Sequence, residues 1–64
     1  MNKLVSIIIP HFNNETILLN CIQSIYRSTY KNFEIIIVDN ASTDDSIKKA
    51  KDKFPSIRII TINF

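Results

Sequence analysis

Three short apolar runs, each rich in isoleucine and valine, constrain the fold of this 64-residue sequence more than any other feature. They cover residues 4–9, 33–38 and 57–62. Nearly continuous apolar runs of this length are typical of strands that are buried on both faces, as in parallel sheets. Pro10 has no N–H group to donate to a neighbouring strand, so we expect the first strand to stop there.

The segment between the first two runs has the period of an amphipathic helix. Its apolar residues recur at i, i+3, i+4 and i+7: Leu18, Cys21, Ile22 and Ile25. Asn14 is expected to cap this helix, and Glu15 suits the positive end of the helix dipole. Cys21 is predicted to be a small core residue.

A second helical pattern separates the second and third runs. Its apolar stripe consists of Ile47, Ala50 and Phe54. We expect Ser42 or Thr43 to cap this helix, with Asp44 and Asp45 as stabilising acids in its first turn. Pro55 should end the helix, because the residue before proline disfavours the helical region.

The predicted order of strand, helix, strand, helix, strand indicates the α/β class, with a three-stranded parallel βαβαβ sheet and right-handed crossovers. We expect the first strand beside the second and the second beside the third. One edge of residues 4–9 would then be unpaired, which is an aggregation liability. Further chain of a longer parent protein, or another copy of this chain, would have to cover it.

Composition excludes several classes of function. The sequence has no glycine, which rules out GxGxxG and Walker A phosphate loops and leaves asparagine or aspartate to fill positions of positive φ. The candidates for such positions are Asn13, Asn14, Asn32 and Asn40. A net charge of +2, with basic and acidic residues interspersed, argues against nucleic acid as a partner. One cysteine provides neither a disulfide framework nor a thiolate metal cluster.

The apolar run near the N-terminus is too short for a signal peptide or a membrane span, so we expect a cytoplasmic protein. Ligands of open parallel sheets bind beyond the carboxyl ends of the strands. Here those ends carry Pro10, His11, Phe12, Asn13, Asp39, Asn40, Ala41, Ser42, Asn63 and Phe64. Two helix N-termini nearby favour phosphates. The residues fit a nucleotide-like ligand, but Asp39 could equally satisfy only the amides of its own turn.

The segment 5–46, VSIIIPHFNNETILLNCIQSIYRSTYKNFEIIIVDNASTDDS, resembles the start of the family 2 glycosyltransferases, which have the GT-A fold. The matching residues keep their order and spacing over essentially the whole chain. The resemblance implies that residues 1–64 are one partial domain, the N-terminal Rossmann-like, nucleotide-binding half of a GT-A domain. The variant at residues 38–42 looks most like bacterial surface-polysaccharide transferases.

The resemblance also implies roles for individual residues. Pro10 and Phe12 match the loop that contacts the base of the sugar donor, and Glu15 matches an acidic position near the ribose. Asp39 matches the aspartate that accepts a hydrogen bond from the ring N–H of uracil or thymine. The residues carried over as nucleotide-sugar-binding are Pro10, Phe12, Asn13, Glu15, Asp39, Asn40 and Ser42. A lone histidine at position 11 is expected to be a bystander.

The complete enzyme is expected to move a sugar from a UDP- or dTDP-sugar to a growing glycan with inversion, at the cytoplasmic face of the membrane. Its divalent metal (Mg²⁺ or Mn²⁺) site, the Asp-x-Asp motif, and its general base match no residue of this chain. We therefore expect no catalytic residue, no metal ligand and no cofactor within residues 1–64, and no transfer activity from this chain alone. The alternative is a non-catalytic α/β module that self-associates through its exposed first strand.

Overall fold

The computed structural model describes residues 3–63 of the chain. Its elements are β1 (Val5–His11), α1 (Glu15–Tyr26), β2 (Phe33–Asn40), α2 (Ser46–Lys53) and β3 (Arg58–Ile62). The strands are parallel in the order β1-β2-β3, which confirms the predicted α/β class and the predicted neighbours. Phe64, one of the expected strand-end residues, lies outside the described residues.

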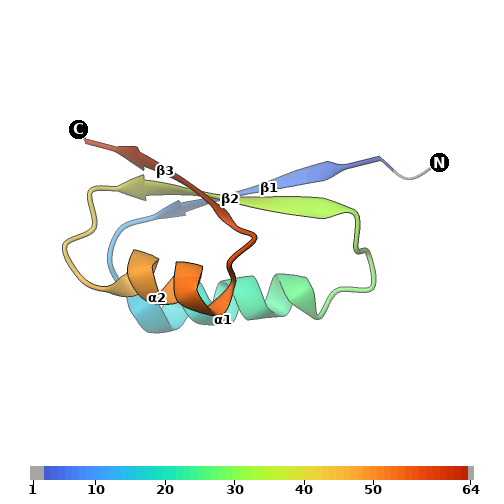
Figure 1. The fold of residues 1–64 in the computed structure, drawn as a ribbon, viewed down its shortest axis with the longest axis horizontal. Coiled ribbons are helices and arrows are strands. Elements are labelled where there is room, and N and C mark those ends of the chain that lie inside the picture. The colour runs from blue at the N-terminus through green and yellow to red at the C-terminus, as the bar shows by residue number, and fades with distance from the viewer. Residues whose placement is uncertain (1–2, 64) are drawn as a thin grey trace.

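Both helices cover the same face of the sheet, so the fold has two layers (Figure 1). Two successive right-handed crossovers that advance in the same direction place both helices on one side. The expectation that the strands are buried on both faces is therefore wrong. Ile8 of β1 is 61% exposed and Ile60 of β3 is 48% exposed.

Because side chains alternate along a strand, each strand sends every second residue away from the helices. This uncovered side is called the open face below. Its apolar members are Ile8, Pro10, Ile36, Val38, Ile60 and Ile62. An apolar sheet surface of this kind explains why the sequence pattern indicated burial on both sides.

The core lies between the sheet and the two helices. Its buried members are Leu18, Ile22, Ile35, Ile37, Ala50 and Ile57. The prediction for Cys21 is wrong, because this side chain is exposed. The buried stripe of α1 extends from Leu18 and Ile22 toward Leu19 and Tyr26, which pack against the core, so Cys21 falls at its margin.

Two strands extend beyond their predicted ends. β1 continues through Pro10 to His11, although Pro10 was expected to stop it. The N–H of Val5 donates to Asn32 beside β2 at 3.0 Å, so residues out of phase with Val5, such as Pro10, have their backbone groups directed away from β2. β1 is an edge strand, and a missing donor on its free side costs no hydrogen bond. β2 continues through Asp39 to Asn40, which pairs with Ile62.

The two helices differ in how they begin. Asn14 caps α1 as predicted, and its side chain accepts a hydrogen bond from the N–H of Ile17 at 3.3 Å. The predicted cap of the second helix is wrong, because α2 begins at Ser46, and its N-cap residue, Asp45, makes no side-chain cap bond. The side chain of Ser42 bonds to Asp39 instead, and Asp44 accepts hydrogen bonds from Ser46, so residues 42–45 form a loop.

Three non-glycine residues within the described range have positive φ: Asn13 (52°), Asn14 (69°) and Ala41 (53°). The first two were predicted, whereas Asn32 and Asn40 do not have this conformation. Ala41 was not expected, because alanine disfavours the left-handed region. All three lie in the loops that follow β1 and β2, at the edge where ligands of parallel sheets bind.

Candidate functional site

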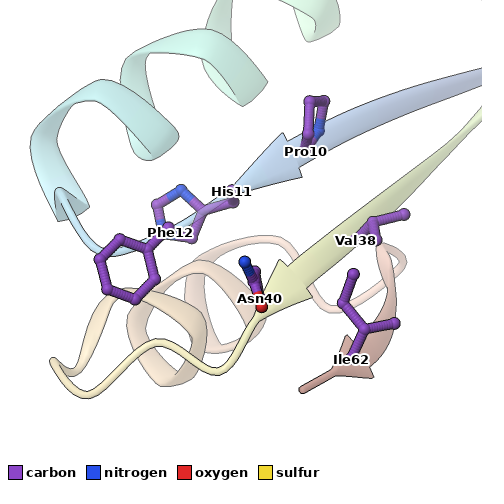
Figure 2. Close-up of a pocket in the computed structure, with 6 residues that line it drawn as sticks. All are labelled: Pro10, His11, Phe12, Val38, Asn40 and Ile62. Carbon is purple, nitrogen blue, oxygen red and sulfur yellow. The ribbon is translucent and has the colours of Figure 1, made fainter. Parts of the chain in front are cut away.

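A cavity of about 390 Å³ lies where the three strands end. It is lined by Pro10, His11, Phe12, Val38, Asn40 and Ile62. Figure 2 shows these side chains coming from β1 and its following loop, from β2 and from β3. The volume is within the range of small-molecule sites, and mostly apolar walls with a few polar groups are typical of them.

The cavity opens on the side of the sheet that the helices leave uncovered. Pro10, Val38 and Ile62 all belong to the open face, and Asn40 follows the same alternation. The ring of Phe12 is 61% exposed and stands in the loop just after β1. An aromatic ring with a free face beside an amide side chain can stack on a planar ligand while the amide bonds to its edge.

Three of the seven predicted site residues line this cavity: Pro10, Phe12 and Asn40. His11, which was predicted to be a bystander, also lines the cavity. Val38 and Ile62 were assigned only to strands. In the paired strands their side chains point to the same face of the sheet as Pro10. This alternation is the sequence signal that could have placed them at this surface.

Asp39 lies on the helix-covered side of β2 and is only 5% exposed. Its carboxylate accepts hydrogen bonds from the hydroxyl of Ser42 and from the N–H of Ser42, the latter at 3.2 Å. The amide and hydroxyl of its own turn are thus the partners of Asp39 in this structure. A carboxylate has about four lone-pair sites, so these bonds leave capacity for a further donor.

Asn13 and Ser42 join the loop after β1 to the loop after β2. The N–H of Asn13 donates to the hydroxyl oxygen of Ser42 at 2.8 Å. In return, the side-chain oxygen of Asn13 accepts from the N–H groups of Thr43 at 2.8 Å and Asp44 at 3.3 Å. These two predicted residues do not line the cavity but connect the two loops beside it.

Asp44 makes the second connection between the loops. Its carboxylate accepts from the N–H of Asn14 at 2.9 Å, and from the N–H and hydroxyl of Ser46 at 3.1 and 2.5 Å. The hydroxyl of Ser46, followed by the N–H groups of Ser46 and Asn14, holds the pKa of Asp44 below its ordinary value of 3.8. The sequence prediction treated Asp44 only as a first-turn acid and missed this role.

Glu15 does not line the cavity. Its carboxylate pairs with the ammonium of Lys49 on α2 at 3.1 Å, and this bond raises the pKa of Lys49. Glu15 thus connects the two helices. The position expected to lie near a ribose is occupied here by an ion pair at the protein surface.

Among residues 3–63, no three His, Cys, Asp or Glu side chains gather closely enough to hold a metal ion. The carboxylates nearest the cavity, Asp39 and Asp44, are already bonded to hydroxyl and amide groups of the chain. The residues described do not fit a divalent metal site. In the same part of the chain, neither helix has the length and apolar character needed to cross a membrane.

Comparison with known families identifies a match over nearly the whole chain. The sequence model described as "Glycosyl transferase family 2" matches residues 6–63. Two similar proteins are bacterial. Glycosyltransferase GlyG of Streptococcus pneumoniae is 44% identical over 46 residues, which are 72% of this chain and 15% of that protein. UDP-Glc:alpha-D-GlcNAc-diphosphoundecaprenol beta-1,3-glucosyltransferase WfaP of Escherichia coli is 46% identical over 63 residues, which are 94% of this chain and 24% of that protein.

The fold is similar to that of a solved enzyme, the mannosyltransferase PcManGT of Pyrobaculum calidifontis in complex with GDP-Man and Mn²⁺. The TM-score is 0.70 at 23% sequence identity, over 92% of this chain and 19% of that one. The chain thus spans about a quarter or less of each of these proteins.

Proposed function

Because the chain belongs to the family 2 glycosyltransferases and has the fold of the N-terminal part of a GT-A domain, we propose that it binds the nucleotide of a sugar donor. The observation that carries this proposal is the cavity at the strand ends, whose lining includes the exposed ring of Phe12 and the amide of Asn40. The base would stack on Phe12, which is worth about 1–3 kcal/mol for aromatic side chains and bases.

The proposed base is uracil or thymine. Either ring has an N–H donor between two carbonyl groups, and Asn40 can both donate and accept. Asp39 is proposed as the negative acceptor for the ring N–H. It lies on the helix-covered side of β2, so the base would reach one of its spare lone pairs from the cavity around the end of the strand. The two hydrogen bonds from Ser42 fix the position of the Asp39 carboxylate and leave some of its lone pairs free to accept.

The proposed activity of the whole protein is transfer of a sugar from a UDP- or dTDP-sugar to a growing cell-surface glycan, with inversion. Two comparisons support a nucleotide-sugar donor, and the first of them supports UDP as its nucleotide. WfaP is named for a UDP-Glc donor and a diphosphoundecaprenol-linked acceptor, and the mannosyltransferase holds GDP-Man. A lipid-linked acceptor would place the reaction at a membrane surface, and the proposed location is the cytoplasm, at the inner face of the membrane.

A divalent metal is proposed for the complete enzyme, because the mannosyltransferase structure contains Mn²⁺. Residues 3–63 hold no group of side chains that could bind it. The diphosphate leaving group would lack a counter-charge in this chain, and such a charge is worth several kcal/mol in catalysis. The 64-residue chain is accordingly proposed to bind nucleotide without transferring sugar.

Calorimetric titration of the chain with UDP, dTDP and GDP tests the donor assignment. We expect UDP and dTDP to bind and GDP to bind more weakly. Phe12→Ala should lower the affinity for UDP by about tenfold, since stacking is lost. Asp39→Asn should also weaken binding, because its NH₂ group replaces one acceptor. Ile17→Ala is the matched control, because Ile17 is 64% exposed and does not line the cavity.

The exposed position of Phe12 means that its removal should leave the fold intact, which circular dichroism will check. Absence of UDP and dTDP binding by the folded wild type would overturn the proposed function. Equal affinities of wild type and Phe12→Ala for UDP would contradict the proposal that the base binds in this cavity.

Self-association is the second candidate function, and the observation that favours it is the exposed apolar edge of the sheet. Leu4, Val5 and Ile8 are all exposed along or just before β1. Light scattering after size-exclusion chromatography tests it. A monomer at high concentration would contradict it, and Ile8→Lys should dissociate any dimer built on this surface.

A further inference from the structure

Two loops surround the candidate site at the carboxyl end of the sheet. The first loop, residues 12–14, joins β1 to α1, and the second loop, residues 41–45, joins β2 to α2. Phe12, at the start of the first loop, lines the cavity, and so does Asn40, immediately before the second loop. Asn40 is held by the pairing of β2 with β3, so the position of the first loop, which the second loop holds, decides where the ring of Phe12 stands relative to the amide of Asn40.

Asn13 bonds to the second loop in both directions. Its N–H donates to Ser42, and its side-chain oxygen accepts from the N–H groups of Thr43 and Asp44. An amide oxygen has two lone pairs, so these two acceptances use its full capacity. Only a side chain with an acceptor at this distance from the backbone can satisfy both N–H groups.

Asp44 bonds back to the first loop. One of its carboxylate oxygens accepts from the N–H of Asn14 at 2.9 Å, while the other accepts from Ser46. The second oxygen thereby fixes Asp44 to the first residue of α2. The first loop thus binds the backbone of the second through one side chain, Asn13, and the second binds the backbone of the first through two, Ser42 and Asp44.

The backbone of the first loop is shaped for these contacts. Asn13 and Asn14 both have positive φ, at 52° and 69°, a conformation that asparagine tolerates better than most residues. Two successive left-handed residues turn the N–H groups of Asn13 and Asn14 toward Ser42 and Asp44. Glycine would tolerate the same backbone but would lack the acceptor.

We propose that Asn13 and Asp44 are positioning residues of the nucleotide site, a role that rests on the proposed function. They hold the first loop against the second, and thereby hold the ring of Phe12 where it and Asn40 engage one base. Ordering the loops before the ligand arrives lowers the entropic cost of binding. Neither side chain lines the cavity, so each acts through the residues that do.

Two substitutions of Asn13 distinguish the effect of its side-chain acceptor from the effect of its backbone conformation. Asn13→Gly and Asn13→Asp both permit positive φ, but only aspartate keeps an oxygen for the N–H groups of Thr43 and Asp44. The measurements are amide hydrogen exchange by NMR and calorimetric titration with UDP. The amide of Ile37, which is completely buried, reports the stability of the core.

We expect Asn13→Gly to lose exchange protection at Thr43 and Asp44 and to bind UDP about five- to tenfold more weakly. Protection at Ile37 should not change, which distinguishes loop positioning from loss of the fold. Asn13→Asp should restore protection at Thr43 and Asp44. The rescue is read from exchange rates, because the added carboxylate would itself repel the diphosphate.

Equal UDP affinities of wild type and a folded Asn13→Gly would overturn the positioning role while leaving the proposed function standing. Failure of the wild type to bind UDP or dTDP would overturn both, without reference to any variant. If Asn13→Gly does not fold, exchange in the wild type decides. Unprotected amides at Asn14, Thr43 and Asp44 would show that the loops are not held together.

Discussion

Nε2 of His11 lies 2.8 Å from the hydroxyl oxygen of Ser46, a residue that is completely buried at the start of α2. The hydroxyl hydrogen of Ser46 is already committed, because that oxygen lies 2.5 Å from the carboxylate of Asp44. A carboxylate only accepts, so Ser46 must donate to it. Ser46 then accepts from His11, and Nε2 of His11 must carry a hydrogen.

This proton order predicts the tautomer of His11. In the neutral ring, Nε2 is protonated and Nδ1 is a free acceptor. A ¹⁵N-resolved NMR spectrum of the imidazole should show this pattern, and Ser46→Ala should abolish the preference. A neutral ring with the hydrogen on Nδ1 would contradict the proton order. His11 lines the candidate site, so in this tautomer Nδ1 is the ring atom that can accept a hydrogen bond from a ligand there.

The contacts between the two loops should depend on pH through Asp44. Its pKa is lowered from 3.8, chiefly by the Ser46 hydroxyl, so the folded state favours the charged carboxylate. The associated stabilisation is complete above pH 3.8 and is lost as the pH falls through the lowered pKa.

The carboxyl carbon of Asp44 should therefore titrate in NMR with a midpoint below 3.8, and protection of the Asn14 amide should disappear over the same range. Ser46→Ala should move the midpoint back toward 3.8. A wild-type midpoint at or above that value would contradict the contacts.

Ala41→Gly should stabilise the chain. Ala41 has a φ of 53°, and the left-handed region costs an L-residue about 1–2 kcal/mol. Glycine removes that cost but adds freedom to the unfolded chain, worth about 0.5–1 kcal/mol. The free energy of unfolding in urea should rise by up to about 1 kcal/mol. Ala50→Gly within α2 is the control, with an expected loss of at least about 1 kcal/mol.

Core and open face should respond differently to the same substitution. Ile37 is completely buried, and replacing it with alanine should cost about 2–5 kcal/mol, enough to unfold much of a small domain. Ile8 is 61% exposed, so Ile8→Ala should change stability by less than about 0.5 kcal/mol. Thermal melts by circular dichroism measure both. A large loss for Ile8→Ala would mean that another molecule covers this surface.

The order of the elements could be predicted because each apolar run and each helical stripe is a local pattern. The run at residues 33–38, for example, is nearly all of β2, and Asn14 caps α1 as its side chain suggested. The uncovered side of the sheet was not predicted. Ile8 and Ile37 are the same residue type in similar runs, and only the topology decides which one the helices cover.

The candidate site was predicted in part for the same reason. Pro10, Phe12 and Asn40 follow from the rule that strand ends form ligand sites. The contacts of Asn13 and Asp44 could not be derived, because they join residues about thirty positions apart. Glu15 was expected near a ribose, and only its distance to Lys49 reveals an ion pair.

The phase of Pro10 in β1 has a consequence for contacts between molecules. Ser6, Ile8 and Pro10 have their backbone groups directed toward the free edge, since they alternate with Val5. Proline has no hydrogen to give, so within β1 (Val5–His11) this edge offers an incoming strand two donors, from Ser6 and Ile8. A β-ribbon that grew from chain to chain would lose its ladder at the end nearest the candidate site. Pro10 thus disfavours edge-to-edge pairing of strands from successive chains, and the same residue lines the cavity.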